Sequence, residues 1–477
     1  MADESGAAGG LSYEELVALV AQLRAENARL RERVEELERQ VNRNSGNSSM
    51  SPSQDQPLSR AERRRRAREA YKRSMRKTGG QPGHRGKTRE MVAPERVDRR
   101  FEHPPERCGC GHLFCGGEER IGDPVVHQQY ELPPARPLVF AHARVRLQCP
   151  ACGRAVLAEL PGPAMSGYGP RLEAHIAMLA GVFRLSREQV RQVVSEVFGI
   201  PSSKGTIDNT LARINAILAD PWAELRDAVR KAEAVHLDET SWRLRGAQQW
   251  LWVAASALVA CYRIDPSRSQ RAAQALIGED VGGFAITDRY AGYHFLDVLQ
   301  QQLCWAHVIR QLTEISQRTG RTGRRGAKLV ALAREVIAAH REYLEHGHEP
   351  QWLADRLAPL RGQIRALLEE CAHGRHQRTA NFASGLLDEY DALWTFADVP
   401  DAGIEPTNNT AERAMRHPVL TRRIQGGSQS ERGNRWTERI QSIRETCRLQ
   451  DRRILEWLTE AVTAAHHGQP IPSLAPT

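Results

Sequence analysis

Two short apolar segments that each end in an aspartate limit the folds open to this chain of 477 residues. The first runs from Ala234 to Asp238 and the second from Phe284 to Asp288, and a third acid, Glu412, follows far downstream. Short apolar runs bounded in this way are typical of buried strands. Three carboxylates brought together can hold two divalent cations, which activate water and stabilise a leaving oxygen in phosphodiester chemistry. The pattern therefore predicts strands that carry acids at or near their ends.

The segment around the first two acids has an informative order of elements. Its periodicity predicts a strand at 232–238, two more around 250–256 and 258–264, a helix at about 269–278, and a strand that runs into Asp288. This β-β-β-α-β order is the opening order of a ribonuclease-H-like fold.

Each of the three acids also has an alternative interpretation. Aspartate is common at strand ends in α/β proteins, so its position alone is weak evidence for a site. Asn409 and Glu412 are spaced like a capping box, in which the glutamate satisfies free amides of the first helical turn. Two neighbouring acids are rivals for the first two positions, Glu239 and Asp297.

Helical periodicity lies on both sides of this segment. Residues 168–218 read as three short helices with a tight turn, which fits a helix-turn-helix and equally fits an ordinary helical subdomain. Residues 296–400 are expected to be mostly helical. From Pro406 onward we expect a helix, a turn at Gly426-Gly427 and a second helix that reaches Cys447.

Residues 14–43 carry an unbroken heptad pattern. Leucine occupies the d positions and valine or asparagine the a positions: Leu16, Leu23, Leu30 and Leu37, with Val20, Asn27, Val34 and Val41. β-Branched a residues with Leu at d favour a parallel two-stranded coiled coil, and one buried Asn fixes its register. The pattern predicts a homodimer, with a lone amphipathic helix as the alternative.

The positive charge of the chain is concentrated in one arm. The formal net charge is +9, yet residues 60–89 alone carry +11 and the rest of the chain about −2. Such an arm fits a polyanionic partner and equally a solvated tether. The densest run of cations is Arg63, Arg64, Arg65 and Arg66.

Five of the nine cysteines are clustered between residues 108 and 152. They are Cys108, Cys110, Cys115, Cys149 and Cys152. The N-terminus has no signal-peptide core, and the longest apolar run, 250–261, is too short to span a bilayer. We therefore expect a cytoplasmic chain without a membrane contact, in whose reducing surroundings clustered cysteines favour a metal over disulfides.

The segment Cys304-Trp305-Ala306-His307-Val308-Ile309-Arg310 offers two further candidates. On a helix His307 and Arg310 share a face, which suits contact with a scissile phosphate. Burial of the histidine in a core is the commoner case.

Several of these blocks, taken in order, resemble one family. They are the N-terminal heptads, Asn44-Ser45-Gly46-Asn47-Ser48-Ser49, Gly79-Gly80-Gln81-Pro82-Gly83-His84-Arg85-Gly86, Cys149-Pro150-Ala151-Cys152, Asp238-Glu239-Thr240, Asp288-Arg289-Tyr290, Cys304-Trp305-Ala306-His307 and Glu405-Pro406-Thr407-Asn408-Asn409-Thr410-Ala411-Glu412-Arg413. Over nearly its whole length the chain is similar to the TnpC-type transposases of the insertion-sequence-sixty-six family, and the last two blocks are the most specific.

The resemblance implies a DDE transposase whose catalytic, metal-binding acids map onto Asp238, Asp288 and Glu412. Hard oxygen ligands of this kind suit Mg²⁺ or Mn²⁺. It further implies a structural Zn²⁺ site, for which the nearest set of four thiolates is Cys108, Cys110, Cys149 and Cys152. The first half departs from the family's usual Cys-x-x-Cys, so Cys115 remains an alternative there, and His112 and His103 are further candidates. His307, Arg310, Arg413 and the arm arginines are expected to position phosphate.

The fold class expected is a multidomain α+β chain. Its parts are a coiled coil (1–45), a basic linker or arm (46–95), a zinc-binding segment (96–160), a helical HTH-like subdomain (161–225), a ribonuclease-H-like core (230–317 and 404–450) with a helical insertion (318–403), and a C-terminal helix and tail (451–477).

The function expected is binding of the ends of a bacterial insertion sequence, followed by metal-dependent strand cleavage and strand transfer. The expected partners are double-stranded DNA of the terminal repeats and the target, a second copy of the chain, and accessory proteins of the same element, in a nucleoid-associated setting. The alternative is a non-catalytic dimeric DNA-binding protein that uses the same arm and zinc segment.

Overall fold

The computed structural model describes residues 90–162 and 166–476 together with six isolated positions nearer the N-terminus, Ala18, Val20, Gln22, Leu23, Glu26 and Arg64. Contacts divide the chain into two units, Gln56–Arg136 and the remainder, and each is described by itself. Of the predicted coiled coil at 14–43, only the five positions between Ala18 and Glu26 named above are described, and all five are helical. The rest of that segment and the arm residues Arg63, Arg65 and Arg66 lie outside the described residues. Within the described ranges no helix is long and apolar enough to cross a membrane.

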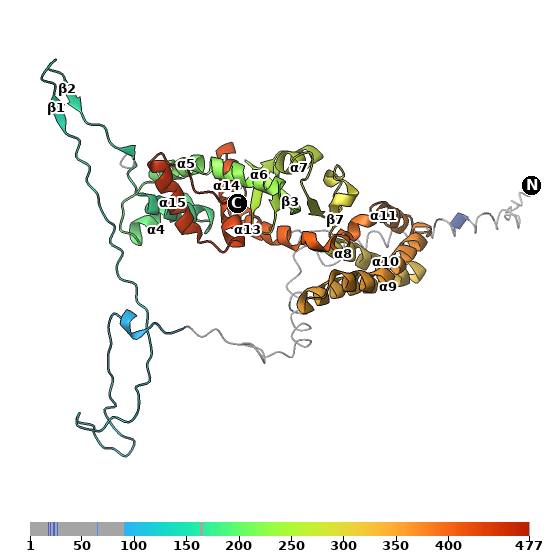
Figure 1. Cartoon of the computed structure of the whole chain (residues 1–477), viewed down its shortest axis with the longest axis horizontal. Helices are drawn as coiled ribbons and strands as arrows, with labels where there is room; N and C mark the ends of the chain where they lie inside the picture. The colour runs from blue at the N-terminus through green and yellow to red at the C-terminus, as the bar shows by residue number, and fades with distance from the viewer. Residues whose placement is uncertain are drawn as a thin grey trace, which may run out of the picture. The chain divides into compact units, whose positions relative to one another are not determined.

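A five-stranded sheet forms the centre of the larger unit (Figure 1). Its spatial order is β5-β4-β3-β6-β7, with β3, β4 and β5 antiparallel and β3, β6 and β7 parallel. The bounds are β3 Ala234–Leu244, β4 Ala247–Ala255, β5 Ala260–Asp265, β6 Phe284–Thr287 and β7 Gln301–Leu303, and helix α7 (Gln270–Ile277) lies between β5 and β6 in the sequence. The β-β-β-α-β order predicted from the sequence is confirmed.

The first strand is longer than expected. β3 continues for six residues beyond Asp238, so this aspartate lies in the middle of the strand and not at its end. The extension pairs with β4 through a two-residue turn at Arg245 and Gly246, whose φ values of 50° and 84° are both positive. Positive φ at both central residues matches the twist of a tight hairpin. The short strand β7 was not expected.

The helices before the sheet follow the predicted pattern. They are α3 Pro170–Gly181, α4 Arg187–Glu196, α5 Lys204–Ile217 and α6 Ala219–Arg230. α4 begins with a capping box at Ser186 and Gln189, and Ser203 caps α5. Ile176, Val190 and Ile207 bring α3, α4 and α5 together in one small core. The three helices expected over 168–218 are confirmed.

A helical lobe follows β7. Its long helices are α8 Trp305–Ser316, α9 Gly320–His346, α10 Pro350–Ala372 and α11 Gln377–Asp388, and Figure 1 shows α9 and α10 side by side. Their apolar faces share a core with Ile286 of β6 and Leu303 of β7. The mostly helical character predicted for 296–400 is therefore confirmed, and this lobe is anchored to the parallel half of the sheet.

Three helices complete the larger unit: α13 Asn409–Gln425, α14 Glu431–Leu449 and α15 Ile454–His466. α13 packs Ala411, Ala414 and Met415 against the face of the sheet that carries Leu251 and Val253 of β4.

α14 covers the outer edge of β5. Glu438, Ser442 and Thr446, spaced four residues apart, accept hydrogen bonds from the backbone amides of Ile264, Tyr262 and Ala260 at 2.7, 2.9 and 3.1 Å. A helix thereby satisfies an edge that would otherwise offer free amides to another strand.

Candidate active site

Asp238 and Asp288 are neighbours because their strands are parallel and in register. The last backbone pair between β3 and β6 is His236 with Ile286. Each aspartate lies two residues beyond that pair, where the two strands separate. Asp238 Oδ1 accepts from the amide of Glu239 at 2.9 Å, and Asp288 Oδ1 accepts from the amide of Tyr290 at 3.0 Å. Both acids thus have an oxygen fixed by the backbone of the following residues.

Strand alternation assigns Asp238 to the α13 face of the sheet. Asp238 lies opposite Val253 of β4 and Glu239 lies opposite Trp252. Directly opposed residues of antiparallel strands point to the same face, and Val253 belongs to the core formed with α13. Asp238 therefore faces the helix that carries Glu412.

The rivals of the two aspartates have other partners. Glu239, on the opposite face, accepts from Arg268 Nε at 2.9 Å and from the hydroxyl of Tyr293 at 2.5 Å. Asp297 is exposed and caps a short 3₁₀ helix by accepting from the amide of Leu299 at 2.9 Å. Neither rival replaces Asp238 or Asp288 beside α13.

Glu412 lies in the first turn of α13 and does not cap it. The N-cap residue is Asn408, and no side chain makes a capping hydrogen bond there. The capping-box interpretation is therefore wrong. Glu412 Oε1 is buried without a hydrogen-bond partner, and its nearest cationic neighbours are Arg310 Nη2 at 3.5 Å and His307 Nδ1 at 3.9 Å.

The three acids interact electrostatically. Burial raises the pKa of Asp238 well above its usual range, and the carboxylates of Glu239, Asp288 and Glu412 raise it further. Burial also raises the pKa of Asp288. The Tyr290 amide and Arg268 oppose this upward shift, and the charge of Glu412 adds to it. Like charges that raise the pKa of a buried carboxyl are the condition that a bound cation relieves.

The side chains stand within electrostatic reach but not in ligating contact. Among residues 90–162 and 166–476, no three His, Cys, Asp or Glu side chains lie close enough to hold a metal ion as they stand. The donors are carboxylate oxygens, and no single cationic side chain pairs with all three acids. Such a set fits a hard divalent ion such as Mg²⁺.

His307 and Arg310 share one face of α8, as predicted, and this face borders Glu412. Arg310 Nη1 lies 3.1 Å from His307 Nε2. Burial and the guanidinium of Arg310 lower the pKa of His307 to about 4, although Glu412 opposes the shift. His307 is thus neutral at pH 7, with Nε2 accepting from Arg310. Arg413 is exposed, and its guanidinium donates to Thr410 within its own helix at 3.1 Å.

Asn408 is a positioning residue that sequence reasoning did not single out. Its Nδ2 donates to the carbonyl of Leu237 at 2.6 Å, and its Oδ1 lies 3.2 Å from His236 Nδ1. Its backbone amide also donates to Cys304 Sγ at 3.1 Å. The one available signal was its place in the Pro406–Arg413 block.

Arg422 is a second missed residue on the same helix. Its guanidinium donates to the hydroxyls of Thr240 and Ser241 at 3.0 and 2.6 Å, and so ties the last turn of α13 to β3. Both ends of α13 are therefore fixed to the strand that carries Asp238.

Four of the five clustered cysteines lie in two tight turns, one in each unit, and Cys115 lies outside both. In the first, the amide of Gly111 donates to the carbonyl of Cys108 at 2.9 Å, and backbone and thiol neighbours lower the pKa of Cys110. In the second, between β1 (Arg146–Gln148) and β2 (Ala155–Leu157), the amides of Cys152 and Ala151 lower the pKa of Cys149. A lowered pKa favours the thiolate that binds a metal.

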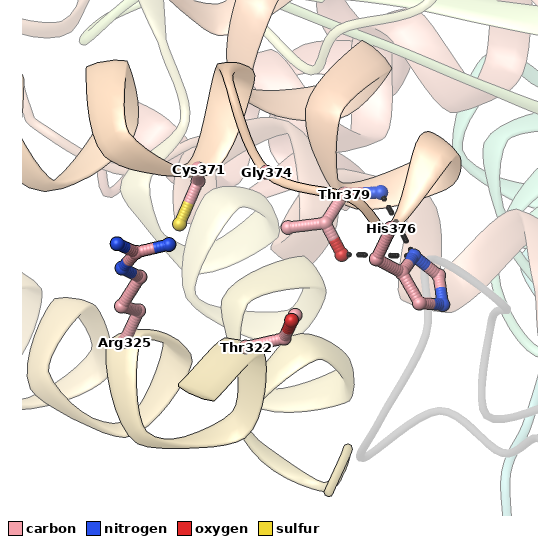
Figure 2. A pocket seen from close by; sticks show the side chains of 6 residues that line it. All are labelled: Thr322, Arg325, Cys371, Gly374, His376 and Thr379. Atoms are coloured by element: carbon pink, nitrogen blue, oxygen red, sulfur yellow. Dashed lines mark hydrogen bonds between the residues drawn. The ribbon is translucent and has the colours of Figure 1, made fainter. Parts of the chain in front are cut away.

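A small pocket lies in the helical lobe and contains none of these acids. Figure 2 shows its lining between α9, α10 and the start of α11, namely Thr322, Arg325, Cys371, Gly374, His376 and Thr379. His376 Nδ1 accepts from the amide of Thr379 at 3.3 Å. The cavity volume of about 10 Å³ is that of one water position, so it does not compete with the carboxylates as a substrate site.

Comparisons with known proteins match most of the chain. A model described as the transposase IS66 family matches residues 165–435, and one described as the zinc-finger binding domain of transposase IS66 matches residues 105–153. A family of unknown function, DUF6444, matches residues 7–90. The uncharacterized protein y4hP of Sinorhizobium fredii (strain NBRC 101917 / NGR234) is 24% identical over 401 residues, which cover 75% of this chain and 70% of that relative.

Proposed function

This chain belongs to the IS66 family of transposases, and we propose that it cleaves and joins DNA strands at the ends of a bacterial insertion sequence. The observation that carries the proposal is the arrangement of Asp238, Asp288 and Glu412, three carboxylates from two parallel strands and one helix whose charges act on one another. The capping role considered for Glu412 is absent, so its buried oxygen has no structural explanation.

The catalytic unit proposed is a ribonuclease-H-like core. The spatial strand order, with β3 central between an antiparallel pair and a parallel pair, supports this assignment. In such a core Asp238, Asp288 and Glu412 hold Mg²⁺ or Mn²⁺. When bound, two such ions supply an activated water for nicking and then an activated 3′-hydroxyl for strand transfer.

The residues beside the acids orient the DNA backbone. Arg310 presents a guanidinium at the border of Glu412, where it can pair with a phosphate oxygen. His307 is neutral at pH 7, so its contribution is orientation of Arg310 through the contact at Nε2. Residues 318–403, the part of the helical lobe that follows α8, separate the second acid from the third in the sequence and act as an insertion in the core.

The other parts of the chain bind DNA and join protomers. The match to a zinc-finger domain over residues 105–153 supports a structural Zn²⁺ held by the thiolates of Cys108, Cys110, Cys149 and Cys152. The arm with Arg63, Arg64, Arg65 and Arg66 and the HTH-like helices contact double-stranded DNA. The heptads of residues 14–43 pair two copies, so that two element ends are held together.

The test is nicking of supercoiled plasmid DNA by the purified chain. We expect nicked circles with Mg²⁺ or Mn²⁺ and none with EDTA. A chain that binds the plasmid in EDTA yet leaves it supercoiled with either metal would instead be a non-catalytic dimeric DNA-binding protein. Footprinting on the ends of its own element then identifies the terminal repeat.

A further inference from the structure

The outer face of α13 carries a row of arginines that begins beside the third acid. Arg413, Arg416 and Arg423 are exposed, and two exposed aliphatic side chains lie among them, Leu420 at 45% and Ile424 at 63% exposure. A helix turns by about 100° per residue, so these five side chains share an arc of roughly 100°, with Glu412 at its border. The row is about 16 Å long at 1.5 Å per residue.

The β3–β4 hairpin extends this row at the far end of α13. The amide of Ser428 donates to the carbonyl of Arg243 at 2.8 Å, and the amide of Arg245 donates to the carbonyl of Ser428 at 2.9 Å. The loop after α13 is therefore bound to the hairpin, and the exposed Arg243 and Arg245 lie at the end of the arginine row.

No acid balances these charges. Residues 413–430 and 240–264 contain neither Asp nor Glu. Within the part of the chain that the structure describes, none of the five arginines forms an ion pair, and the side-chain partners of three of them are neutral oxygens, Thr410 Oγ1, the Gly246 carbonyl and the Gln429 carbonyl. The excess of positive charge is thus available to a ligand.

Helix electrostatics do not account for the arginine row. Cations near a helix C-terminus are stabilised by the helix dipole, which suits Arg423. Arg413, however, is the fifth residue of α13, near the opposite end of the helix, where the dipole does not stabilise a cation. The neighbourhood of Arg422 is also crowded with like charge, because Arg423 and Arg243 both lower its pKa beyond the effect of burial. An anionic ligand along the row relieves this repulsion.

We propose that the outer face of α13, together with the tip of the β3–β4 hairpin, is the track along which duplex DNA leaves the carboxylates. Arg413, Arg416 and Arg423 contact backbone phosphates, and Leu420 and Ile424 contact the sugars between them. A row of about 16 Å matches roughly five base pairs at 3.4 Å each. The proposal rests on the proposed function for the identity of its substrate.

The test uses the full chain and a fluorescein-labelled 30-base-pair duplex of arbitrary sequence without added Mg²⁺ or Mn²⁺, so that no cleavage occurs and the structural zinc is kept. For the variant R416A/R423A we expect the slope of log K against log salt to fall by about 2, and the affinity at physiological salt to fall roughly 10- to 100-fold. The matched control is R334A/R341A, which removes two exposed arginines from α9, and its slope should equal that of the wild type.

A second variant separates the two kinds of contact. L420A/I424A should lower the affinity about 3- to 10-fold and leave the salt slope unchanged, because no phosphate contact is lost. If R416A/R423A keeps the slope of the control, the track is overturned. If it keeps that slope and instead changes the sedimentation of the chain, the face is an interface between copies.

Failure of the track and failure of the proposed function give different results. If the wild-type chain nicks plasmid DNA but R416A/R423A binds DNA with an unchanged salt slope, the track alone is refuted. A wild-type chain that never nicks, although R416A/R423A lowers the slope as expected, refutes the proposed function and leaves the track in place.

Discussion

Asn408 donates a hydrogen bond of 2.6 Å to the carbonyl oxygen of Leu237, 171 residues earlier in the chain. Leu237 immediately precedes Asp238, and Asn408 is the residue at which the helix of Glu412 begins. One side-chain amide therefore sets the distance between the first and the third acid. The interaction is buried, since Asn408 is only 1% exposed.

Replacing Asn408 with alanine should separate the acids without removing any of them. The change leaves the Leu237 carbonyl and the His236 ring without partners, at a cost of about 1–3 kcal/mol in the free energy of unfolding. We expect plasmid nicking to slow by about 10²-fold while duplex binding in EDTA is kept. The neighbouring exposed residue gives the control, N409A, which should nick at the wild-type rate. Equal rates for both variants would remove Asn408 from its positioning role.

The three acids should be individually essential for cleavage. D238N, D288N and E412Q each remove a ligand charge, and we expect losses on the order of 10³-fold or more in the nicking rate with DNA binding nearly intact. D297N is the matched control, because Asp297 is exposed and caps only a short 3₁₀ helix. An E412Q variant that nicks normally would show that the helix N-terminus, and not the metals, needs this glutamate.

The same acids should lower the stability of the metal-free chain at neutral pH. Because the pKa values of Asp238 and Asp288 are raised on folding, their contribution to stability is complete below the pKa of a free carboxyl and is lost as the pH rises through their folded values. In EDTA, D288N should therefore melt above the wild type at pH 7, by about 2–4 °C per kcal/mol of relieved repulsion.

Calorimetry with and without metal provides the control for that prediction. Mg²⁺ should raise the melting temperature of the wild type and have little effect on D288N. If D288N instead melts below the wild type in EDTA, the prediction is wrong. Asp288 would then stabilise the fold, through the hydrogen bond that it accepts from Tyr290, by more than its charge repulsion destabilises it.

Metal analysis of cysteine variants should settle the composition of the zinc site. C110S and C149S should each lose the bound zinc, because removal of one thiolate opens a four-coordinate structural site. C115S should retain it: Cys115 lies outside the turn closed by Cys108 and Gly111. The measurement is zinc per chain by mass spectrometry after dialysis. If C115S loses the zinc and C110S keeps it, then Cys115 is the ligand and Cys110 is not.

Deleting residues 1–42 should separate end joining from end cleavage. The heptads predict a dimer, and the deletion removes them while leaving the described sheet and helices intact. Single-end nicking should persist, and joining of two ends should fall more steeply. Sedimentation of the full and shortened chains tests this prediction, which fails if both are monomers or both are equally stable dimers at micromolar concentration.

The sequence predicted those elements whose pattern is local. The strands around Val235, Val253 and Ile286 and the helices on either side have clear periodicity, and the structure contains them. β7 escaped prediction because two of its three buried side chains are glutamines, Gln301 and Gln302, which are satisfied by hydrogen bonds to Thr287 and Leu393. No hydrophobic pattern marks such a strand.

Long-range pairing accounts for the remaining differences. The extension of β3 past Asp238 is mostly polar, with Trp242 as its one buried apolar side chain, and it is paired as a strand with β4. The roles of Asn408 and Arg422 depend on partners 171 and 181–182 residues away. The positions of the three acids, by contrast, could be proposed from their motifs, although their spatial relation required the parallel register of β3 and β6.

The ladder of Glu438, Ser442 and Thr446 along β5 has a consequence for synthesis of the protein. Both the cover of this strand and the third acid come from residues after 405. While a ribosome is still translating the chain, the sheet has an open edge and only two of its carboxylates. A nascent or truncated product is therefore prone to pair with other strands through β5. Under the proposed function it also lacks the third carboxylate needed for cleavage, so the last part of the chain to be made supplies both the cover of the edge and the completion of the site.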